Sequence, residues 1–149
     1  MSEQLVTLAE IEAARERIRP WIGATPLVAL SGSGVLLKAE SLQASGAFKL
    51  RGAFNTLLQL SADARARGVV AHSSGNHAVA VAMAAARLGI PATVVMPNDA
   101  PAVKLEWTRA LGANVELVGP ASSERAARAA RLADAHGLTL VEPYDARPI

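Results

Sequence analysis

The chain has 149 residues, of which 51% are apolar and 19% are charged, a balance that excludes an intrinsically disordered protein. Its net charge of +2 is too small to indicate nucleic-acid binding, and its arginines are dispersed. The absence of cysteine excludes a disulfide framework, a thiolate zinc site and a cysteine nucleophile. The three histidines are scattered, with no carboxylate at ligand spacing, so we expect no metal site. An acidic, periodic N-terminus and the lack of a bilayer-length apolar run predict a cytoplasmic protein that does not enter membranes.

The first predicted element is a helix that begins after Thr7 and ends at Pro20. Thr7 and Glu10 have the spacing of a capping box, and apolar residues recur behind them at helical intervals. A Ser-Gly-Ser-Gly turn separates the two extended segments that follow. These segments and the next predicted helix cover residues 25–28, 35–39 and 48–60.

From residue 69 onward, short β-rich segments alternate with helical ones. The strands start at intervals of 23, 22 and 24 residues, the length of a strand–helix repeat. The predicted strands cover residues 69–72, 92–96, 114–118 and 138–141, and the predicted helices cover 76–88, 101–111 and 122–136. The alternation predicts an α/β fold with an open parallel sheet and flanking helices, in three αβα layers. Alanine, about a fifth of the chain, suits helices that pack closely on such a sheet.

Ligands of such sheets bind beyond the carboxyl ends of the strands. Two stretches occupy that position, residues 73–77 after the first strand and residues 96–101 after the second. The first stretch places two hydroxyl groups and an amide at a helix N-terminus, where free N–H groups favour a carboxylate or a phosphate. The same residues also suit an ordinary helix N-cap, so the pattern leaves both interpretations open.

Lys49 is one of only three lysines in the chain, beside Lys38 and Lys104. It stands at the start of a predicted helix among small and apolar residues. Partial burial and the positive end of the helix both favour the neutral amine, which is the nucleophilic form. A surface lysine at a helix start is the alternative.

Two motifs resemble those of a known enzyme family. Residues 40–53 are similar to the lysine motif of the fold-type II pyridoxal-phosphate enzymes, in the branch that contains threonine and serine dehydratases and serine racemase. Residues 73–78 resemble the second motif of that branch, at the expected distance. Further matching landmarks are Thr25-Pro26-Leu27, Met96-Pro97, Ala100-Pro101, Lys104 and Gly112-Ala113-Asn114-Val115. Arg51 and His77 favour the dehydratase branch over the related cysteine synthases.

The resemblance implies pyridoxal 5′-phosphate as the cofactor, with Lys49 forming a Schiff base with it and later acting as the base at the substrate Cα. Phe48 would pack against the pyridine ring, and Asn76 would form a hydrogen bond with the 3′-oxygen. The substrate carboxylate would be held by Ser73, Ser74, Gly75 and His77. In racemase-like members a serine at the position of Ser74 also acts as acid or base on the opposite face.

The implied activity is the elimination of water from serine or threonine, which gives a 2-oxo acid and ammonia. Serine racemisation is the alternative activity, and a non-catalytic α/β domain is the alternative outside enzymes. The implied partner is a small amino-acid substrate, and members are usually dimers, so we expect the full-length form to be a homo-oligomer.

Family members run to roughly twice this length, as two-domain proteins. By resemblance, residues 1–50 belong to the large domain and residues 51–149 form the small α/β domain. The resembling proteins hold the cofactor phosphate with a Gly-rich loop at positions beyond residue 149, so we expect the 149 residues by themselves to be inactive. We also expect exposed apolar side chains on the first part of the chain, at Leu27, Val28, Leu36 and Leu37.

Overall fold

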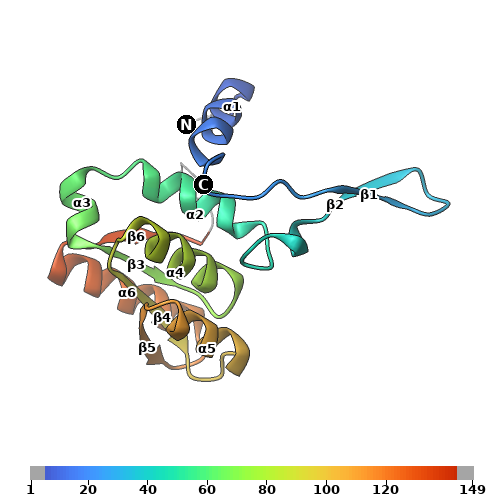
Figure 1. The fold of residues 1–149 in the computed structure, drawn as a ribbon. Coiled ribbons are helices and arrows are strands. Elements are labelled where there is room, and N and C mark those ends of the chain that lie inside the picture. Colours follow the sequence, from blue (N-terminus) through green and yellow to red (C-terminus); the bar gives the residue numbers. More distant parts are fainter. Residues whose placement is uncertain (1–5, 144–149) are drawn as a thin grey trace, which may run out of the picture.

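A computed structural model describes residues 6–143 as an α/β body with a hairpin extending from it (Figure 1). The helices are α1 (Leu8–Ile18), α2 (Lys49–Leu58), α3 (Ala62–Arg67), α4 (Asn76–Leu88), α5 (Ala102–Ala110) and α6 (Ser122–His136), with a 3-10 turn, η1 (Glu40–Leu42). The strands are β1 (Leu27–Leu30), β2 (Val35–Lys38), β3 (Val69–His72), β4 (Ala92–Pro97), β5 (Asn114–Val118) and β6 (Thr139–Val141). Within residues 6–143, no helix has both the length and the apolar character needed to cross a bilayer.

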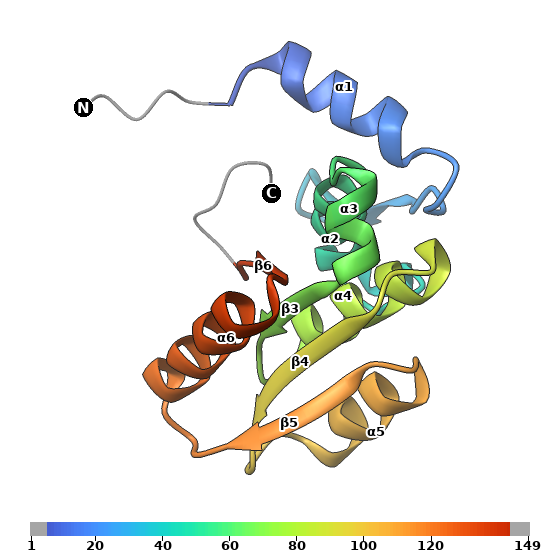
Figure 2. The same cartoon turned by 90° about the vertical axis from the view of Figure 1, so that its left-hand side faces the viewer.

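The main sheet has the order β5-β4-β3-β6, and all its strand pairs are parallel. Figure 2 shows α6 on one side of this sheet and α5 on the other. The predicted three-layer α/β fold is therefore confirmed.

Alternate residues of the strands supply the two faces of the sheet. Val70 and Val95 pack with Ala129 of α6, whereas Val94 and Met96 pack with alanines of α4 on the opposite face. All four strand side chains are fully buried. Continuous apolar strands of this kind are typical of a parallel sheet covered on both faces.

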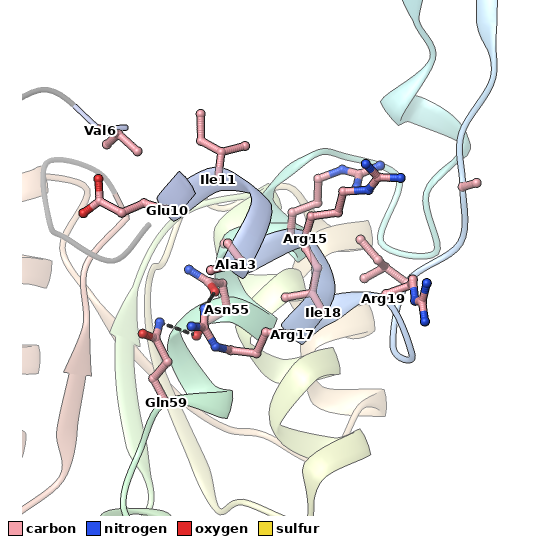
Figure 3. A pocket seen from close by; sticks show the side chains of 15 residues that line it. Val6, Glu10, Ile11, Ala13, Arg15, Arg17, Ile18, Arg19, Asn55 and Gln59 are labelled. Atoms are coloured by element: carbon pink, nitrogen blue, oxygen red, sulfur yellow. Dashed lines mark hydrogen bonds between the residues drawn. The ribbon is translucent and has the colours of Figure 1, made fainter. Parts of the chain in front are cut away.

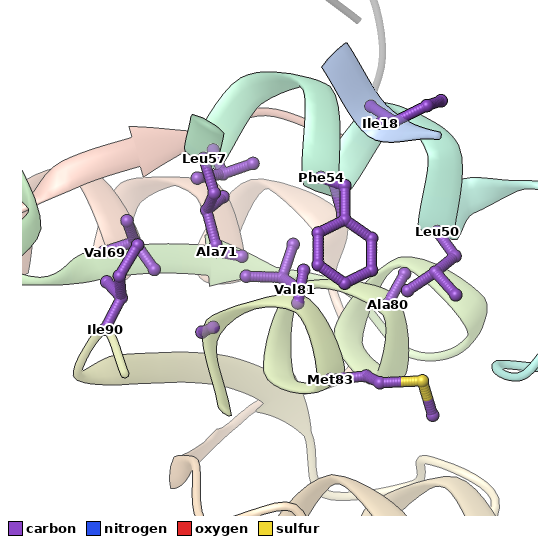
Figure 4. Packing of buried hydrophobic residues seen from close by; sticks show 14 residues of the cluster. Ile18, Leu50, Phe54, Leu57, Val69, Ala71, Ala80, Val81, Met83 and Ile90 are labelled. Carbon is purple, nitrogen blue, oxygen red and sulfur yellow. The ribbon is translucent and has the colours of Figure 1, made fainter. Parts of the chain in front are cut away.

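The central helix α4 is buried on two sides. Every residue from His77 to Ala85 is buried, because the sheet covers one side of the helix and α2 covers the other. Figure 4 shows Phe54 of α2 reaching toward Ala80 and Val81 of α4. The alanines of α4 thus have the role that the composition predicted, since small side chains let flat layers approach closely.

The helix predicted over residues 76–88 has these bounds in the structure, and the capping box of α1 is present. Thr7 Oγ1 accepts from the Glu10 N–H at 3.3 Å, and the Glu10 carboxylate accepts from the Thr7 N–H at 2.7 Å. The sequence analysis missed α3, which has only six residues and no apolar period. Two residues mark the ends of α3 in the sequence: Ser61, whose hydroxyl caps the helix, and Gly68, which ends it with φ 99°.

The first extended segment starts two residues later than predicted. β1 begins at Leu27 because Thr25 bonds outside the hairpin, with the carboxylate of Glu40, and Pro26 has no N–H to donate. Pro101 also differs from its predicted place, since it is the N-cap of α5 rather than a residue of its first turn.

The β1–β2 hairpin extends away from the α/β body (Figure 1). Its turn contains Gly32 and Gly34, both with positive φ, as the Ser-Gly-Ser-Gly sequence predicted. All eight of its strand residues are exposed, including the four predicted apolar ones, Leu27, Val28, Leu36 and Leu37. Other parts of the first 50 residues belong to the body, because Ile18 is in its core and Trp21 stacks on Phe54.

Replacing Phe54 tests the packing of α2 on α4. Its ring is fully buried, and its centroid lies 5.7 Å from that of Trp21. Phe54→Ala should therefore lower the free energy of unfolding by about 3–5 kcal/mol in urea denaturation followed by circular dichroism. The control is Phe48→Ala, since Phe48 is 60% exposed and its loss should change stability by no more than about 0.5 kcal/mol. Equal small losses in both variants would contradict this packing.

Candidate active site

Lys49 is the first residue of α2, and side-chain hydrogen bonds hold the loop that precedes it. The loop begins at Gln43, which is buried and whose side-chain amide donates to the Gly23 carbonyl at 3.0 Å. The hydroxyl of Ser45, also buried, donates to the carbonyl of Ala47 at 3.1 Å. These bonds fix the backbone on the N-terminal side of the lysine.

The amino group of Lys49 lies at a pocket of about 240 Å³ between the starts of α2 and α4. The lining residues are Phe48, Lys49, Gly52, Ala53, His77 and Val141. Lys49 Nζ donates to the Pro143 carbonyl and lies 5.4 Å from the centroid of the Phe48 ring. Because Phe48 is exposed, the pocket offers an amino group beside an open aromatic face.

The side chain of His77 is buried and bound to the backbone. Its Nε2 lies 3.1 Å from the Val141 carbonyl, which can only accept, so Nε2 carries the proton. Burial lowers the pKa of His77, and the charge of Lys49 lowers it further, against the opposing effect of the bond to Val141. The imidazole is therefore neutral at pH 7, with its Nε2–H directed to the protein backbone.

The turn from Ser73 to Asn76 leaves the N-terminus of α4 without a side-chain cap. Gly75 is the N-cap residue, and no side chain forms the capping bond, which removes the plain N-cap as an explanation of this sequence. The Ser73 hydroxyl instead accepts from the Gly75 N–H at 3.1 Å, within the turn. Ser74 and Asn76 are exposed. An uncapped helix start of this kind retains N–H groups that can bind an anion.

The pocket brings together Phe48, Lys49 and His77 of the residues that the sequence singled out. Residues 73–76 form the turn that leads into His77, but they are not among the lining residues. The second candidate stretch, residues 96–101, contributes none of the residues that line this pocket. It is joined instead to β5, where the Asn98 N–H donates to the Val118 carbonyl at 2.9 Å.

The sequence analysis missed the segment of Val141, Glu142 and Pro143. Three side chains of the site region hold it: His77 at Val141, His72 at the Glu142 carboxylate, 3.3 Å away, and Lys49 at Pro143. The segment follows β6, which lies beside β3. Because residues that follow a parallel strand lie at the carboxyl edge of the sheet, where ligands bind, its position in the sequence could have marked it as part of the site.

A larger groove of about 750 Å³ lies between α1 and α2 (Figure 3). There Arg17 of α1 donates to the side chain of Asn55, and Gln59 donates to the Asn55 carbonyl at 2.8 Å. Arg51 lines this groove as well, but none of the predicted site residues does. Among the described residues that line the groove, only Gly52 also lines the Lys49 pocket.

The neutral state of His77 should make stability depend on pH. In the unfolded chain His77 takes up a proton near its ordinary pKa of about 6.5, whereas the folded chain resists this because of the lowered pKa. The free energy of unfolding should therefore fall as pH drops below about 6.5, and His77→Gln should lack this part of the slope. Urea titrations from neutral to mildly acidic pH would measure it.

His136→Gln is the matched control for the substitution itself, because His136 is exposed at the end of α6 and does not line the Lys49 pocket. A slope in His77→Gln equal to that of the wild type would contradict the assignment.

A family model described as pyridoxal-phosphate dependent enzyme matches residues 18–149. An L-threo-3-hydroxyaspartate ammonia-lyase of a Pseudomonas species is 43% identical over 95% of this chain and 46% of its own length. The catabolic L-threonine dehydratase TdcB of Staphylococcus aureus is 40% identical over 95% of this chain and 43% of its own length. The chain thus spans less than half the length of these relatives.

Solved structures agree with these matches. Maize serine racemase superposes with a TM-score of 0.91 at 35% identity, covering 96% of this chain and 45% of that one. A serine racemase from Dictyostelium discoideum gives a TM-score of 0.86 at 36% identity, covering 95% of this chain and 48% of that one. With the lysine pocket and the parallel sheet, the match over residues 18–149 shows that the chain belongs to the family of pyridoxal-phosphate-dependent enzymes.

Proposed function

We propose that the whole protein is a pyridoxal-phosphate-dependent ammonia-lyase. It would remove water from serine, threonine or a similar β-hydroxy amino acid and release a 2-oxo acid and ammonia. The observation that carries the proposal is Lys49, whose amino group lies at a pocket shared with Phe48 and His77. The relatives named as threonine dehydratase and hydroxyaspartate ammonia-lyase support the reaction class.

The residues present fit the cofactor. A primary amine can bind an aldehyde, and Lys49 lines the pocket together with Phe48, whose ring is exposed. Phe48 would pack against the pyridine ring, and the exposed Asn76 would form a hydrogen bond with the 3′-oxygen. When bound, pyridoxal phosphate supplies an electron sink that stabilises negative charge at the substrate Cα.

The chain's own residues would bind the substrate and move the proton. The uncapped start of α4 would hold the substrate carboxylate through the turn of Ser73, Ser74 and Gly75 and through the backbone N–H of His77. The His77 ring keeps its bond to Val141, so it would support the turn from behind. Lys49 Nζ would leave the Pro143 carbonyl and hold the cofactor until the substrate amine displaces it, and the freed amino group would then accept the proton from Cα.

Serine racemisation is the second candidate, favoured by the exposed serine at position 74 and by the similarity to maize serine racemase. Racemisation needs an acid or base on each face of Cα, and Ser74 would serve the face opposite Lys49. The proposal also includes a homo-oligomer and a domain boundary near residue 50. The exposed apolar hairpin supports the homo-oligomer, since it extends from the body without a covering layer among the described residues (Figure 1).

Removing Lys49 is the direct test of the lyase proposal. In the full gene product, Lys49→Ala should abolish the visible absorption band of lysine-bound cofactor and lower turnover of L-serine and L-threonine by at least about 10²-fold. Borohydride reduction followed by peptide mass mapping should place the cofactor of the wild type on Lys49, out of the three lysines of the chain.

Lys104→Ala is the matched control, because Lys104 Nζ lies 5.3 Å from the Trp107 ring, much as Lys49 lies against Phe48. This variant should keep both the band and the turnover. Wild-type turnover in Lys49→Ala would overturn the assignment, and a wild type that binds no cofactor would favour the non-catalytic alternative.

Ser74→Ala separates the two candidate activities. If Ser74 is the second acid or base, its loss should lower racemisation of serine by about 10²-fold while elimination from the L-isomer falls much less. Chiral chromatography of serine and an assay of pyruvate release measure the two rates, with Ser122→Ala at the start of α6 as a remote control. Equal loss of both activities would mean that Ser74 only positions the carboxylate.

A further inference from the structure

Arg51 and Glu40 form a two-point ion pair beside the Lys49 loop. Arg51 Nε lies 2.8 Å from Glu40 Oε2, and Arg51 Nη2 lies 2.7 Å from Glu40 Oε1. The hydroxyl of Thr25 also donates to the Glu40 carboxylate, and the ammonium group of Lys38 donates to the Thr25 carbonyl. We call Thr25, Lys38, Glu40 and Arg51 the Glu40 clamp. It joins both ends of the β1–β2 hairpin to the first turn of α2.

The carboxylate at the centre of the clamp is ionised and held on several sides. The hydrogen bond from Arg51 lowers the pKa of Glu40, with further lowering by Thr25 and Lys38 and an opposing effect of burial. The Glu40 side chain is 15% exposed and that of Arg51 is 34% exposed, so water still reaches the pair. Partly exposed ion pairs contribute little to stability, so the geometry of the clamp matters more than its energy.

Arg51 and Lys49 point to opposite sides of α2. Two residues along a helix turn the side chain by about 200°. In agreement, Arg51 lines the groove toward α1, and Lys49 lines the pocket with His77. A rotation of the first turn of α2 that moves Arg51 away from Glu40 would therefore also displace Lys49 relative to its pocket.

We propose that the Glu40–Arg51 ion pair positions Lys49 by fixing the rotation of the first turn of α2. The inference rests on the proposed function, in which the Lys49 amino group both holds the cofactor and moves a proton. Arg51 is then a positioning residue that touches neither substrate nor cofactor.

The side-chain bonds of Gln43 and Ser45 fix the loop before Lys49, but they do not reach the helical turn that Lys49 begins. Leu50 anchors the same turn in the core, but an apolar contact is non-directional and tolerates rotation. No side chain caps the N-terminus of α2, so the backbone of that turn lacks this restraint as well. The paired N–H···O bonds of a guanidinium and a carboxylate are directional, which is the property that holds a rotation.

The test compares Arg51→Met, Arg51→Lys and Glu40→Gln with the wild type in the full gene product. Arg51→Met should lower kcat by about 10²-fold and leave KM for the amino acid nearly unchanged, because a small displacement of the catalytic amine affects the reaction more than substrate binding. The rate at which borohydride traps cofactor on Lys49 should fall in parallel. Arg51→Lys keeps the charge without the planar fork, so it should restore only part of both rates.

The matched control is Arg128→Met. Arg128 forms an ion pair with Glu116 of β5, with side chains 36% and 31% exposed, which is similar chemistry far from Lys49. The Arg128→Met variant should shift the melting temperature about as much as Arg51→Met but leave kcat and borohydride trapping at Lys49 unchanged. If Arg51→Met matches Arg128→Met in kcat and trapping, the inference is wrong.

A purely structural role predicts a different result. Loss of kcat only in proportion to the unfolded fraction, or an unfolded Arg51→Met together with a fully active Glu40→Gln, would overturn the inference. Both outcomes differ from failure of the proposed function. If the proposed function is wrong, the wild type itself shows neither trapping at Lys49 nor turnover, and the inference about Arg51 is then wrong as well.

Discussion

The burial of α4 between the sheet and α2 is the constraint on which the rest of the structure depends. A helix that must be apolar on two sides can be covered closely only if its side chains are small, and α4 meets this with alanine at Ala78, Ala80, Ala82, Ala84 and Ala85. The close packing brings α2 near the carboxyl edge of β3. The first residue of α2 and the first turn of α4 then meet at one pocket, which is why Lys49 and His77 are neighbours.

The candidate site is assembled from three separate parts of the chain. The start of α2 supplies the amine, the start of α4 supplies backbone N–H groups, and the end of β6 supplies two carbonyl groups. These carbonyls belong to Val141 and Pro143, and they accept from His77 and Lys49. Backbone acceptors can do this with almost any side chain at their position, so such a role leaves little trace in a sequence.

Local patterns made most of the fold predictable. The central strands β3 and β4 are rich in buried valine, and the helices of the α/β body have caps or glycine ends, so propensity and tertiary structure agree. The lysine and the turn proposed to bind an anion could also be singled out in the sequence, because each motif is continuous. The clamp could not, since Glu40 and Arg51 are 11 residues apart and Thr25 lies 15 residues before Glu40. The contact between these three side chains depends on the path of the β1–β2 hairpin away from the body and back to it, and no local sequence pattern encodes that path.

The β1–β2 hairpin gives the molecule two levels of local stability. Val28, Leu30, Val35 and Leu37 share one face of the hairpin, and Leu27 and Leu36 lie on the other, all exposed. An isolated two-stranded ribbon is at best marginally stable in water, whereas the central strands β3 and β4 are largely buried between helices. Hairpin amides therefore open at little free-energy cost, while those of β3 and β4 open only when the body unfolds. Since the clamp joins this easily opened ribbon to the turn that carries Lys49, an element that stiffens the hairpin would also steady the Lys49 amino group.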